Sequence, residues 1–203
     1  MSLLQEQFGP IDIYLFDQLL RDRISPGMRI FDAGCGSGRN LVYLLKSGYE
    51  VFGVDADRNA VEETRRLAAS LAPALPAGNF RVEDLAASSF PDAFADVALS
   101  SAVLHFARDD DHFGAMLRST WRVLKPGGLF FCRLASSIGI EQEIQPVHGR
   151  RCLLPDGSER YLVDAEFLVS LTHHLGGQLL DPLKTTVIHQ QRSMTTWVVG
   201  KNA

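Results

Sequence analysis

The sequence predicts a doubly wound α/β fold whose mostly parallel, seven-stranded sheet ends in an antiparallel C-terminal strand. Short apolar runs alternate with amphipathic stretches over the first two thirds of the chain, which is typical of repeated strand–helix–strand units. A glycine-rich segment joins the first apolar run to the next helix, and the last two runs are close enough in sequence to pair antiparallel. With 203 residues, 46% hydrophobic and 22% charged, the chain can form one domain with its own core.

The first two thirds of the chain are expected to supply five strands separated by helices. Apolar residues at helical spacing predict a first helix over residues 12–23, which Ser25–Pro26–Gly27 would end. Pro126–Gly127–Gly128 predicts a sharp turn before the fifth strand. In chain order, the predicted strands are 28–33, 50–55, 80–83, 94–100 and 129–134, and the later helices are 40–47, 58–71 and 112–124.

The last third has a different pattern. Residues 136–149 have weak periodicity and predict a loop or a short helix. The runs 151–154 and 160–163 flank turn-forming residues, which favours a hairpin. Asp164 is a candidate N-cap for a helix that ends near Leu175, and two paired strands are expected over 178–189 and 193–200.

Composition excludes several classes of protein. The net charge of −4 argues against a basic footprint, so neither a nucleic acid nor a membrane surface is expected as a partner. No apolar run approaches the ~18 residues of a membrane span, and the first ten residues do not resemble a secretory signal. The three cysteines are widely spaced, which favours neither a disulfide scaffold nor a metal site, and fits a cytoplasmic protein.

The segment after the first strand carries the strongest functional signal. Gly34, Gly36 and Gly38 allow a tight turn and a close approach of a ligand to the backbone. Asp55, at the end of the next strand, is placed to accept both hydroxyls of a ribose. Dinucleotides and S-adenosylmethionine are both bound in this way. The spacing GxGxG differs from the dinucleotide GxGxxG, and Asp32 beside the loop suits an ammonium group better than a pyrophosphate.

Five segments together resemble a known family. Residues 31–38 (FDAGCGSG), 53–55 (GVD), 81–85 (RVEDL), 96–100 (DVALS) and 124–128 (LKPGG) match, in order, the motifs of class I S-adenosylmethionine-dependent methyltransferases, which have a Rossmann-like fold. Within that family, residues 36–49 and 99–106 resemble the tellurite-resistance branch over about half of the chain. The resemblance weakens after Leu134, where the residues that shape an acceptor pocket would lie.

The resemblance implies a role for each matching residue. Asp32 would bind the amino group of the cofactor, Asp55 the ribose hydroxyls and Asp84 the adenine amino group, with Glu83 as a competitor for the last role. Arg39 would meet the cofactor carboxylate. The complete set of expected cofactor-binding residues is Asp32, Gly34, Cys35, Gly36, Arg39, Asp55, Ala56, Asp84, Leu85 and Ser100, with no metal ligand.

The acceptor side is expected to involve fewer and less regular signals. His105 follows the fourth strand, where a histidine could act as a general base. The resemblance implies one domain over 1–203, with a helical lid or cap at 1–24 that includes Tyr14, and a variable insertion at 135–163. Arginines near the fifth strand and the hairpin, namely Arg133, Arg150, Arg151 and Arg160, could hold an anionic acceptor.

The expected function is methyl transfer from S-adenosylmethionine to a small-molecule acceptor by in-line displacement, with the acceptor unidentified. A general base is needed only if the acceptor must lose a proton. Three alternatives stay open: a methyltransferase that acts on a macromolecule, a non-catalytic S-adenosylmethionine-binding module, and a nicotinamide-dependent oxidoreductase. A monomer or a homodimer is expected.

Overall fold

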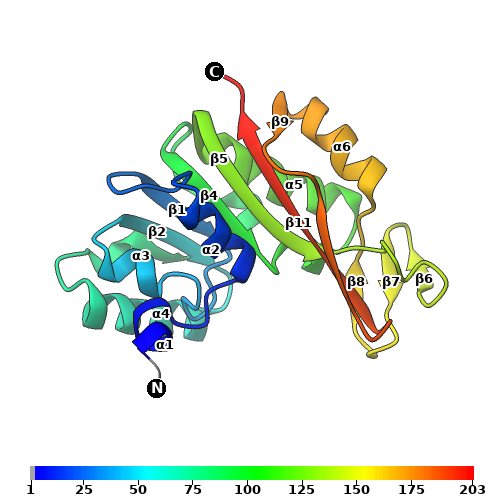
Figure 1. Cartoon of the computed structure of the whole chain (residues 1–203), viewed down its shortest axis with the longest axis horizontal. Coiled ribbons are helices and arrows are strands. Elements are labelled where there is room, and N and C mark those ends of the chain that lie inside the picture. The colour runs from blue at the N-terminus through cyan, green and yellow to red at the C-terminus, as the bar shows by residue number, and fades with distance from the viewer. Residues whose placement is uncertain (1–2) are drawn as a thin grey trace.

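A computed structural model describes residues 3–203 of the chain. A twisted sheet runs through the middle of the molecule with helices on both faces, and a second, small sheet lies beside one end of it (Figure 1). The helices are α1 (Leu3–Phe8), α2 (Ile13–Leu20), α3 (Val42–Lys46), α4 (Arg58–Leu71), α5 (Asp110–Val123) and α6 (Ala165–His174), with 3₁₀ turns η1 (Ala77–Asn79), η2 (Leu85–Ala87) and η3 (Leu104–Phe106).

The central sheet has eight strands. Its order is β10-β11-β5-β4-β1-β2-β3, and β9 also pairs with β11. The strands are β1 (Arg29–Ala33), β2 (Glu50–Asp55), β3 (Phe80–Val82), β4 (Ala95–Ser101), β5 (Leu124–Ala135), β9 (Gly177–Leu179), β10 (Lys184–Ile188) and β11 (Arg192–Lys201). Strands β1 to β5 are parallel, and β11 runs antiparallel to β5, which confirms the predicted fold class.

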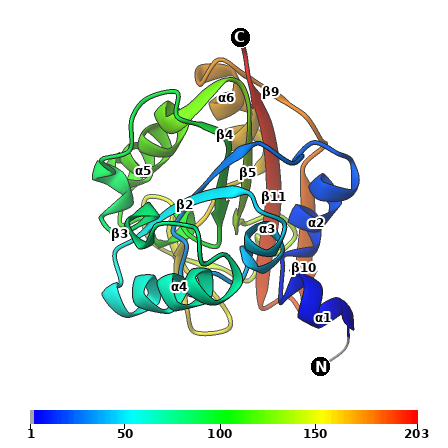
Figure 2. The ribbon, with the colours of Figure 1, turned by 90° about the vertical axis from the view of Figure 1, so that its left-hand side faces the viewer.

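Alternating side chains divide the core between the two faces of the sheet. Ile30 of β1 packs with Leu44 of α3 and Val61 of α4 on one face. The next residue, Phe31, packs on the other face with α5 residues such as Phe113. Figure 2 shows this layering, with α5 on one side of the sheet and α2 on the other. Full burial of both faces explains why the parallel strands are nearly continuous apolar runs.

Aspartates begin four of the helices as the cap pattern predicts. The side chains of Asp12, Asp57, Asp109 and Asp164 accept hydrogen bonds from backbone N–H groups in the first turns of α2, α4, α5 and α6. The side chain of Asp109 is therefore occupied in capping α5. Within residues 3–203, no three His, Cys, Asp or Glu side chains are arranged to hold a metal ion.

Two strand predictions were wrong in detail. Pro126–Gly127–Gly128 lies inside β5 rather than before it, and it forms a bulge there: Gly127 has φ +76°, and the pairing with β4 shifts register between Ala95–Leu124 and Val97–Leu129. The expected strand 178–189 is divided into β9 and β10 by residues 180–183, and both parts pair with β11. The division gives the sheet one strand more than predicted.

The expected hairpin is confirmed and gains a third strand. β7 (Arg151–Leu153) and β8 (Glu159–Tyr161) pair antiparallel, and β6 (Gln145–His148) adds to β7. All four residues of β6 are exposed, so no apolar alternation marks this strand in the sequence. A small apolar cluster that includes Ala135, Ile140 and Leu154 joins this sheet to the end of β5.

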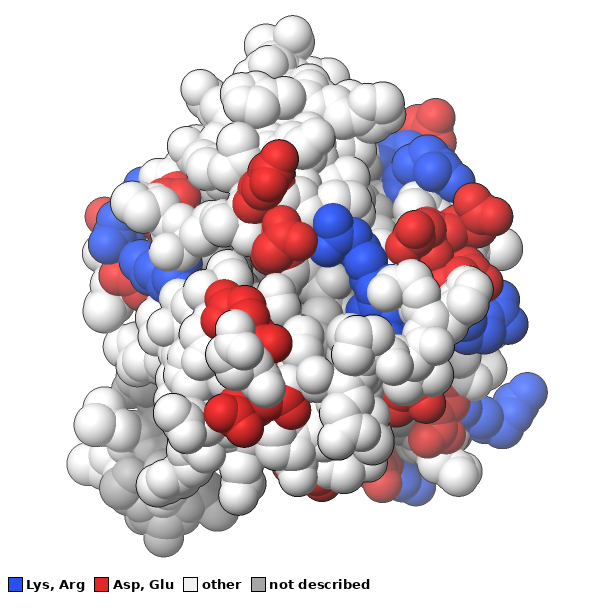
Figure 3. Space-filling view, turned by 90° about the vertical axis from the view of Figure 1, so that its right-hand side faces the viewer, with Lys and Arg blue, Asp and Glu red and all other residues white. Residues whose placement is uncertain are grey.

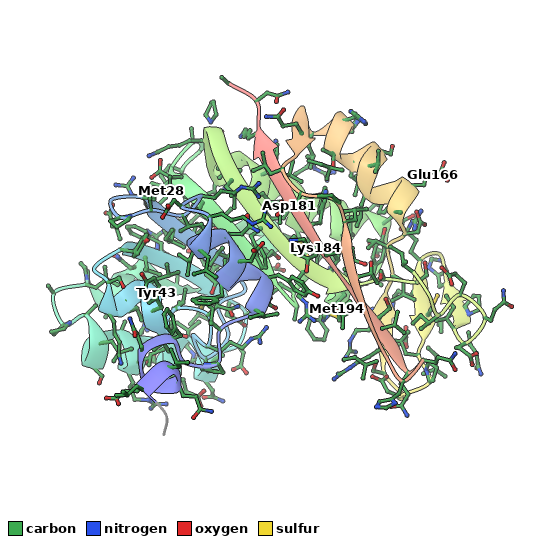
Figure 4. All side chains as sticks on the ribbon, in the orientation of Figure 1. Met28, Tyr43, Glu166, Asp181, Lys184 and Met194 are labelled. Atoms are coloured by element: carbon green, nitrogen blue, oxygen red, sulfur yellow. The ribbon has the colours of Figure 1, made fainter. Side chains whose placement is uncertain are left out.

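The N-terminal helices pack against the domain. Phe8 of α1 stacks on Tyr43 of α3 with ring centroids 5.0 Å apart, and Tyr43 is labelled in Figure 4. Asp181, after β9, accepts hydrogen bonds from Gln18 and Arg21 of the α2 region. Residues 1 and 2 of the predicted 1–24 cap lie outside the described residues. Over the part of the chain that the structure describes, no helix combines the length and apolarity that a bilayer crossing requires.

Candidate functional site

A cavity of about 550 Å³ lies at the carboxyl ends of the parallel strands. The register places the ends of β1, β2 and β4 at one edge of the sheet, because Asp32 pairs with Gly53 of β2 and with Leu99 of β4. The cavity is lined by Asp32, Gly34, Cys35, Gly36, Ser37, Arg39, Asn40, Asp55, Ala56, Asp84, Leu85, Ser101, Ala102, Val103, Phe106, Arg108, His112 and Met116. The structure thus brings together nine of the ten predicted cofactor-binding residues.

Asp55 ties the glycine loop to the second strand. Its Oδ2 accepts the N–H of Gly36 at 2.9 Å, and its Oδ1 accepts the N–H of Asp57 at 2.9 Å. A carboxylate offers about four lone-pair sites, so both oxygens can accept a further hydrogen bond. The loop bond fixes the carboxylate at the cavity wall, where two hydroxyls of a ribose could each meet one oxygen.

Asp32 is the most buried carboxyl group of the site. Its exposed fraction is 3%, and burial together with the nearby Asp55 charge raises its pKa to about 8, while Arg39 opposes the shift. Burial and a neighbouring negative charge both make the ionised form of a carboxyl group costly, unless a cation lies close to it. The inner end of the cavity therefore has the electrostatics of a site for an ammonium group.

Asp84 and Leu85 form the wall that follows β3. Asp84 accepts the N–H of Ala86 at 2.9 Å and begins the 3₁₀ turn η2, in which Leu85 is buried. Glu83, the competing acid, instead accepts the N–H of Ser89 at 2.9 Å and does not line the cavity. Asp84 is thus the acid of this pair that faces the site.

Arg39 lies across the cavity mouth from the end of β4. Its Nη2 donates to Ser101 Oγ at 3.0 Å. Ser101 lines the cavity, whereas the predicted Ser100 is fully buried and does not. Side chains alternate along a strand, so the prediction was off by one residue at this position.

Cys35 lines the cavity without being a reactive group. Burial, the largest cause, and the charges of Asp32 and Asp55 raise the pKa of its thiol. A thiol held protonated in this way is a weak nucleophile. Its position between Gly34 and Gly36 suits backbone contact with a ligand.

Several lining residues escaped the sequence analysis. Phe106, Arg108, His112 and Met116 come from the segment after β4 and from α5. Met116 of α5 is both 95% buried and part of the cavity wall. Nothing local in the sequence indicates that α5 contributes to the same cavity wall as the glycine loop.

The side chains that line this cavity fit S-adenosylmethionine. Carboxylates at Asp32, Asp55 and Asp84 match an ammonium group, ribose hydroxyls and an exocyclic amine, and Leu85 and Met116 provide apolar contact for a ring. A Cβ on Gly36 would meet no atom within 4 Å, so the missing side chain leaves the loop backbone open to the cavity. The volume lies within the usual range for small-molecule sites.

His105 lies outside this cavity. It is buried in η3, and its Nδ1 accepts the backbone N–H of Ala135 at 3.1 Å. Burial, and secondarily the Arg160 charge, lower its pKa to about 4, so the ring is neutral at physiological pH. With Nδ1 used as an acceptor, the ring proton sits on Nε2, which makes that nitrogen a donor. This arrangement does not fit the predicted general base.

The predicted arginine cluster assembles only in part, because Arg133 and Arg160 line one cavity together while Arg150 and Arg151 are held elsewhere. Arg150 pairs with Asp164 at 2.8 Å, and its guanidinium lies over the ring of Phe167. Arg151 pairs with Glu159 at 2.6 Å and donates to the carbonyl of Ala107. Neither arginine lines the cofactor cavity, because local carboxylates on the hairpin and on α6 hold them elsewhere.

Tyr14 and Arg133 also lie outside the cavity of about 550 Å³. The Tyr14 hydroxyl is hydrogen-bonded to Thr186 Oγ1 at 2.9 Å, and Tyr14 does not line the cofactor cavity. Arg133 pairs with Asp12 at 3.2 Å. The N–H of Asp12 in turn donates to Asn40 Oδ1 at 3.0 Å, so the N-terminal segment reaches the cavity wall through Asn40.

Comparison with known proteins agrees with this geometry. Residues 31–132, half of the chain, match the family model described as a methyltransferase domain. An uncharacterized methyltransferase, YodH of Bacillus subtilis, is 36% identical over 121 residues, 60% of this chain and 46% of that protein. The 2-methyl-6-phytyl-1,4-hydroquinone methyltransferase of Synechocystis sp. is 34% identical over 109 residues, 53% of this chain and 32% of that protein.

A solved structure shares the fold over most of the chain. The crystal structure of the Burkholderia thailandensis 1,6-didemethyltoxoflavin-N1-methyltransferase, with its substrate and S-adenosylhomocysteine bound, superposes with a TM-score of 0.70 at 20% identity. The match covers 91% of this chain and 76% of that one. The two curated relatives are matched over less than half of their length. The sheet order and the acidic cavity are consistent with the match to the family model. The chain therefore belongs to the S-adenosylmethionine-dependent methyltransferase family.

Proposed function

We propose that this chain binds S-adenosylmethionine in the 550 Å³ cavity and transfers its methyl group to a small-molecule acceptor. One observation carries the proposal. Acidic side chains at or just beyond the carboxyl ends of three successive strands, Asp32, Asp55 and Asp84, converge on a single cavity beside an open glycine loop. Family membership alone would leave the use of this particular cavity unassigned.

In this proposal each residue has a binding role. Asp55 holds the ribose hydroxyls while its bond to Gly36 keeps the loop in place, and Asp32 holds the ammonium group. Asp84 and Leu85 hold the adenine. When bound, S-adenosylmethionine supplies a methyl group on a positively charged sulfur, so the protein mainly has to position and align an acceptor.

A small-molecule acceptor is favoured by what the relatives act on and by the surface. Both the Synechocystis and the Burkholderia proteins carry small-molecule acceptors in their names. On the face shown in Figure 3, basic side chains lie among acidic ones rather than gathering in one basic patch. The narrower resemblance to the tellurite-resistance branch stays a prediction, since it rests on segments that build the cofactor cavity.

The test is calorimetric titration with S-adenosylmethionine, S-adenosylhomocysteine and NAD. Both adenosyl compounds should bind, NAD should not, and Asp55→Ala should abolish binding because it removes the ribose acceptor and the loop bond. Asp57→Ala is the matched control. Its side chain caps α4 and does not line the cavity, so binding should persist.

Methyl transfer is then measured as S-adenosylhomocysteine formation with a panel of thiols, phenols and amines. A protein that binds both adenosyl compounds, but forms no product with any acceptor, would be a binding module rather than an enzyme. Failure to bind either compound would contradict the proposed site.

A further inference from the structure

A second cavity of about 300 Å³ adjoins the cofactor cavity. Ala102, directly after β4, lines both cavities, and its N–H donates to the carbonyl of Arg133 at 2.7 Å. Phe106 lines the first cavity and His105 the second, and their rings meet edge to face at 4.6 Å. Residues 102–106 therefore contribute to the boundary between the two cavities.

Three arginines from separate strands line this second cavity: Arg133 of β5, Arg160 of β8 and Arg192 of β11. Among residues 3–203, neither Arg160 nor Arg192 lies within ion-pair distance of a carboxylate, in contrast to Arg150 and Arg151. The guanidinium of Arg160 lies 4.8 Å from the ring centre of Phe106, at the boundary between the cavities. Arg133 pairs with Asp12, but its buried Nε has no hydrogen-bond partner.

Asp156 is the acidic residue that lines the same cavity. Its Oδ1 accepts hydrogen bonds from the N–H and the hydroxyl of Ser158, at 2.9 and 2.6 Å. These bonds hold the pKa of Asp156 below its usual range, with Arg192 and Arg160 contributing, so it is ionised. Because Asp12 compensates the charge of Arg133, Arg160 and Arg192 against Asp156 leave an excess of one positive charge at the cavity, and the neutral His105 adds a donor without adding charge.

We propose that the methyl acceptor carries an anionic group, a carboxylate or a phosphate, which Arg160 and Arg192 bind in this second cavity. Bidentate guanidinium groups are the side chains best suited to hold either anion. The anionic group would anchor the acceptor, while its nucleophilic atom faces the cofactor cavity past Ala102 and Phe106. This inference rests on the proposed methyl transfer, and it assigns acceptor selection to Arg160 and Arg192. Arg160 is oriented by a hydrogen bond to the carbonyl of Glu159 at 2.8 Å and by the ring of Phe106, and neither arginine is in an ion pair within residues 3–203.

The position of the second cavity also gives a role to the small sheet formed by β6, β7 and β8. β8 delivers Arg160, the turn before it delivers Asp156, and the start of β11 delivers Arg192. Met194, labelled in Figure 4, belongs to the same wall and lies near the start of β11, the end of that strand closer to the small sheet. The insertion predicted at 135–163 thus contributes a charged wall to a cavity that the central sheet alone would leave open.

The test uses acceptors in matched pairs that differ only in charge. Carboxylic acids are compared with their primary amides, and phosphate monoesters with their parent alcohols, across thiol, phenol and amine scaffolds. Binding of each member to the protein saturated with S-adenosylhomocysteine is measured by calorimetry, and turnover by S-adenosylhomocysteine formation. Members with an anionic group should bind and be methylated in preference to their neutral partners, and the two kinds of pair distinguish carboxylate from phosphate.

Charge variants on the cavity wall should change this preference in opposite directions. Arg192→Gln and Arg160→Gln should lower kcat/KM for the preferred anionic acceptor about 10- to 100-fold, mainly through KM, and change its neutral partner little. Asp156→Asn keeps the oxygen that accepts from Ser158 but removes a negative charge, so it should raise affinity for the anion. Arg66→Gln is the control, because Arg66 is exposed on α4, far in sequence from the cavity wall and absent from it.

The outcomes separate the two proposals. If S-adenosylhomocysteine binds but no acid or phosphate is preferred to its neutral partner, the anionic acceptor is refuted and the proposed function stands. The same follows if Arg192→Gln and Asp156→Asn both behave like Arg66→Gln. If S-adenosylhomocysteine does not bind at all, the failure lies with the proposed function.

Discussion

Asp32 shows how a single residue acquires a role from its surroundings. The residue lies near the carboxyl end of the buried strand β1, and the tertiary structure encloses its side chain and places Asp55 nearby. A carboxyl group with a pKa of about 8 is largely protonated at neutral pH, whereas an ammonium ligand requires the ionised form. Ligand binding and proton release at Asp32 are therefore coupled.

The affinity for S-adenosylhomocysteine should rise with pH up to about 8. Below that pH, binding must remove the Asp32 proton, so the dissociation constant should fall by up to about tenfold for each pH unit gained. Above pH 8 the affinity should level off. Calorimetry at pH 6, 7 and 8, in buffers of different ionisation enthalpy, measures both the affinity and the proton released.

The Asp32→Asn variant is the control for this dependence, because it cannot ionise. Its affinity should be lower than that of the wild type at pH 8 and nearly independent of pH. Without ligand, the wild-type protein should lose stability as pH rises from about 4 to about 8, since the folded state holds the Asp32 proton more tightly than the unfolded chain does. An Asp32→Asn protein with the wild-type pH profile would show that another group titrates.

At the scale of elements, the glycine loop needs glycine at two positions for two different reasons. Gly34 has φ +93°, and a Cβ there would lie 2.4 Å from Cγ2 of Val103. Gly36 has φ +52°, but a Cβ there would meet no atom within 4 Å. The first glycine is required by the packing of the loop, and the second leaves room for a ligand.

Alanine substitutions should separate these demands. Gly34→Ala should lower the free energy of unfolding by about 2–4 kcal/mol, from backbone strain plus overpacking. Gly36→Ala should cost about 1–2 kcal/mol from the backbone alone, yet reduce cofactor affinity at least about tenfold. Urea unfolding and calorimetry measure the two effects. Wild-type affinity in Gly36→Ala would mean that the cofactor does not approach this loop.

Removal of α1 alone and removal of α1 with the first part of α2 should affect cofactor affinity differently. None of residues 3–9 lines the cofactor cavity. Deletion of residues 1–9 should therefore leave the affinity for S-adenosylhomocysteine within about twofold of the wild-type value. Deletion of residues 1–16 also removes the buried Leu15 and the Asp12 contact to Asn40, so it should lower both stability and affinity. Thermal unfolding and calorimetry on both truncations check this. An affinity unchanged by the longer deletion would remove the predicted lid or cap role.

At the scale of the whole molecule, the site is assembled from segments far apart in the chain. Hydrogen exchange with and without S-adenosylhomocysteine should show slower exchange at 34–40, 55–57, 84–87 and 101–106, which surround the cavity. The fully exposed β6 should not change. Protection confined to β6 or to α1 would place the cofactor elsewhere.

How much could be predicted depended on the range of the interactions involved. The strands β1 and β2, the helix α4 and the glycine loop were predicted closely, because apolar runs, an aspartate cap and left-handed glycines act within a few residues. β6 and the division between β9 and β10 were missed. Their pairing is decided by partners far along the chain, and β6 buries nothing that would mark its pattern.

The sequence by itself determined the fold class and indicated the motif residues that line the cavity of about 550 Å³, since each motif residue acts on a backbone segment beside it. Only the tertiary structure decided which charges remain available. It paired Arg150 with Asp164 and Arg151 with Glu159, and it brought Arg160 and Arg192 together from strands that are not neighbours in sequence. Whether a charged side chain binds a ligand depends on which opposite charges lie within a few ångströms of it, and that distance is set by the folded chain alone.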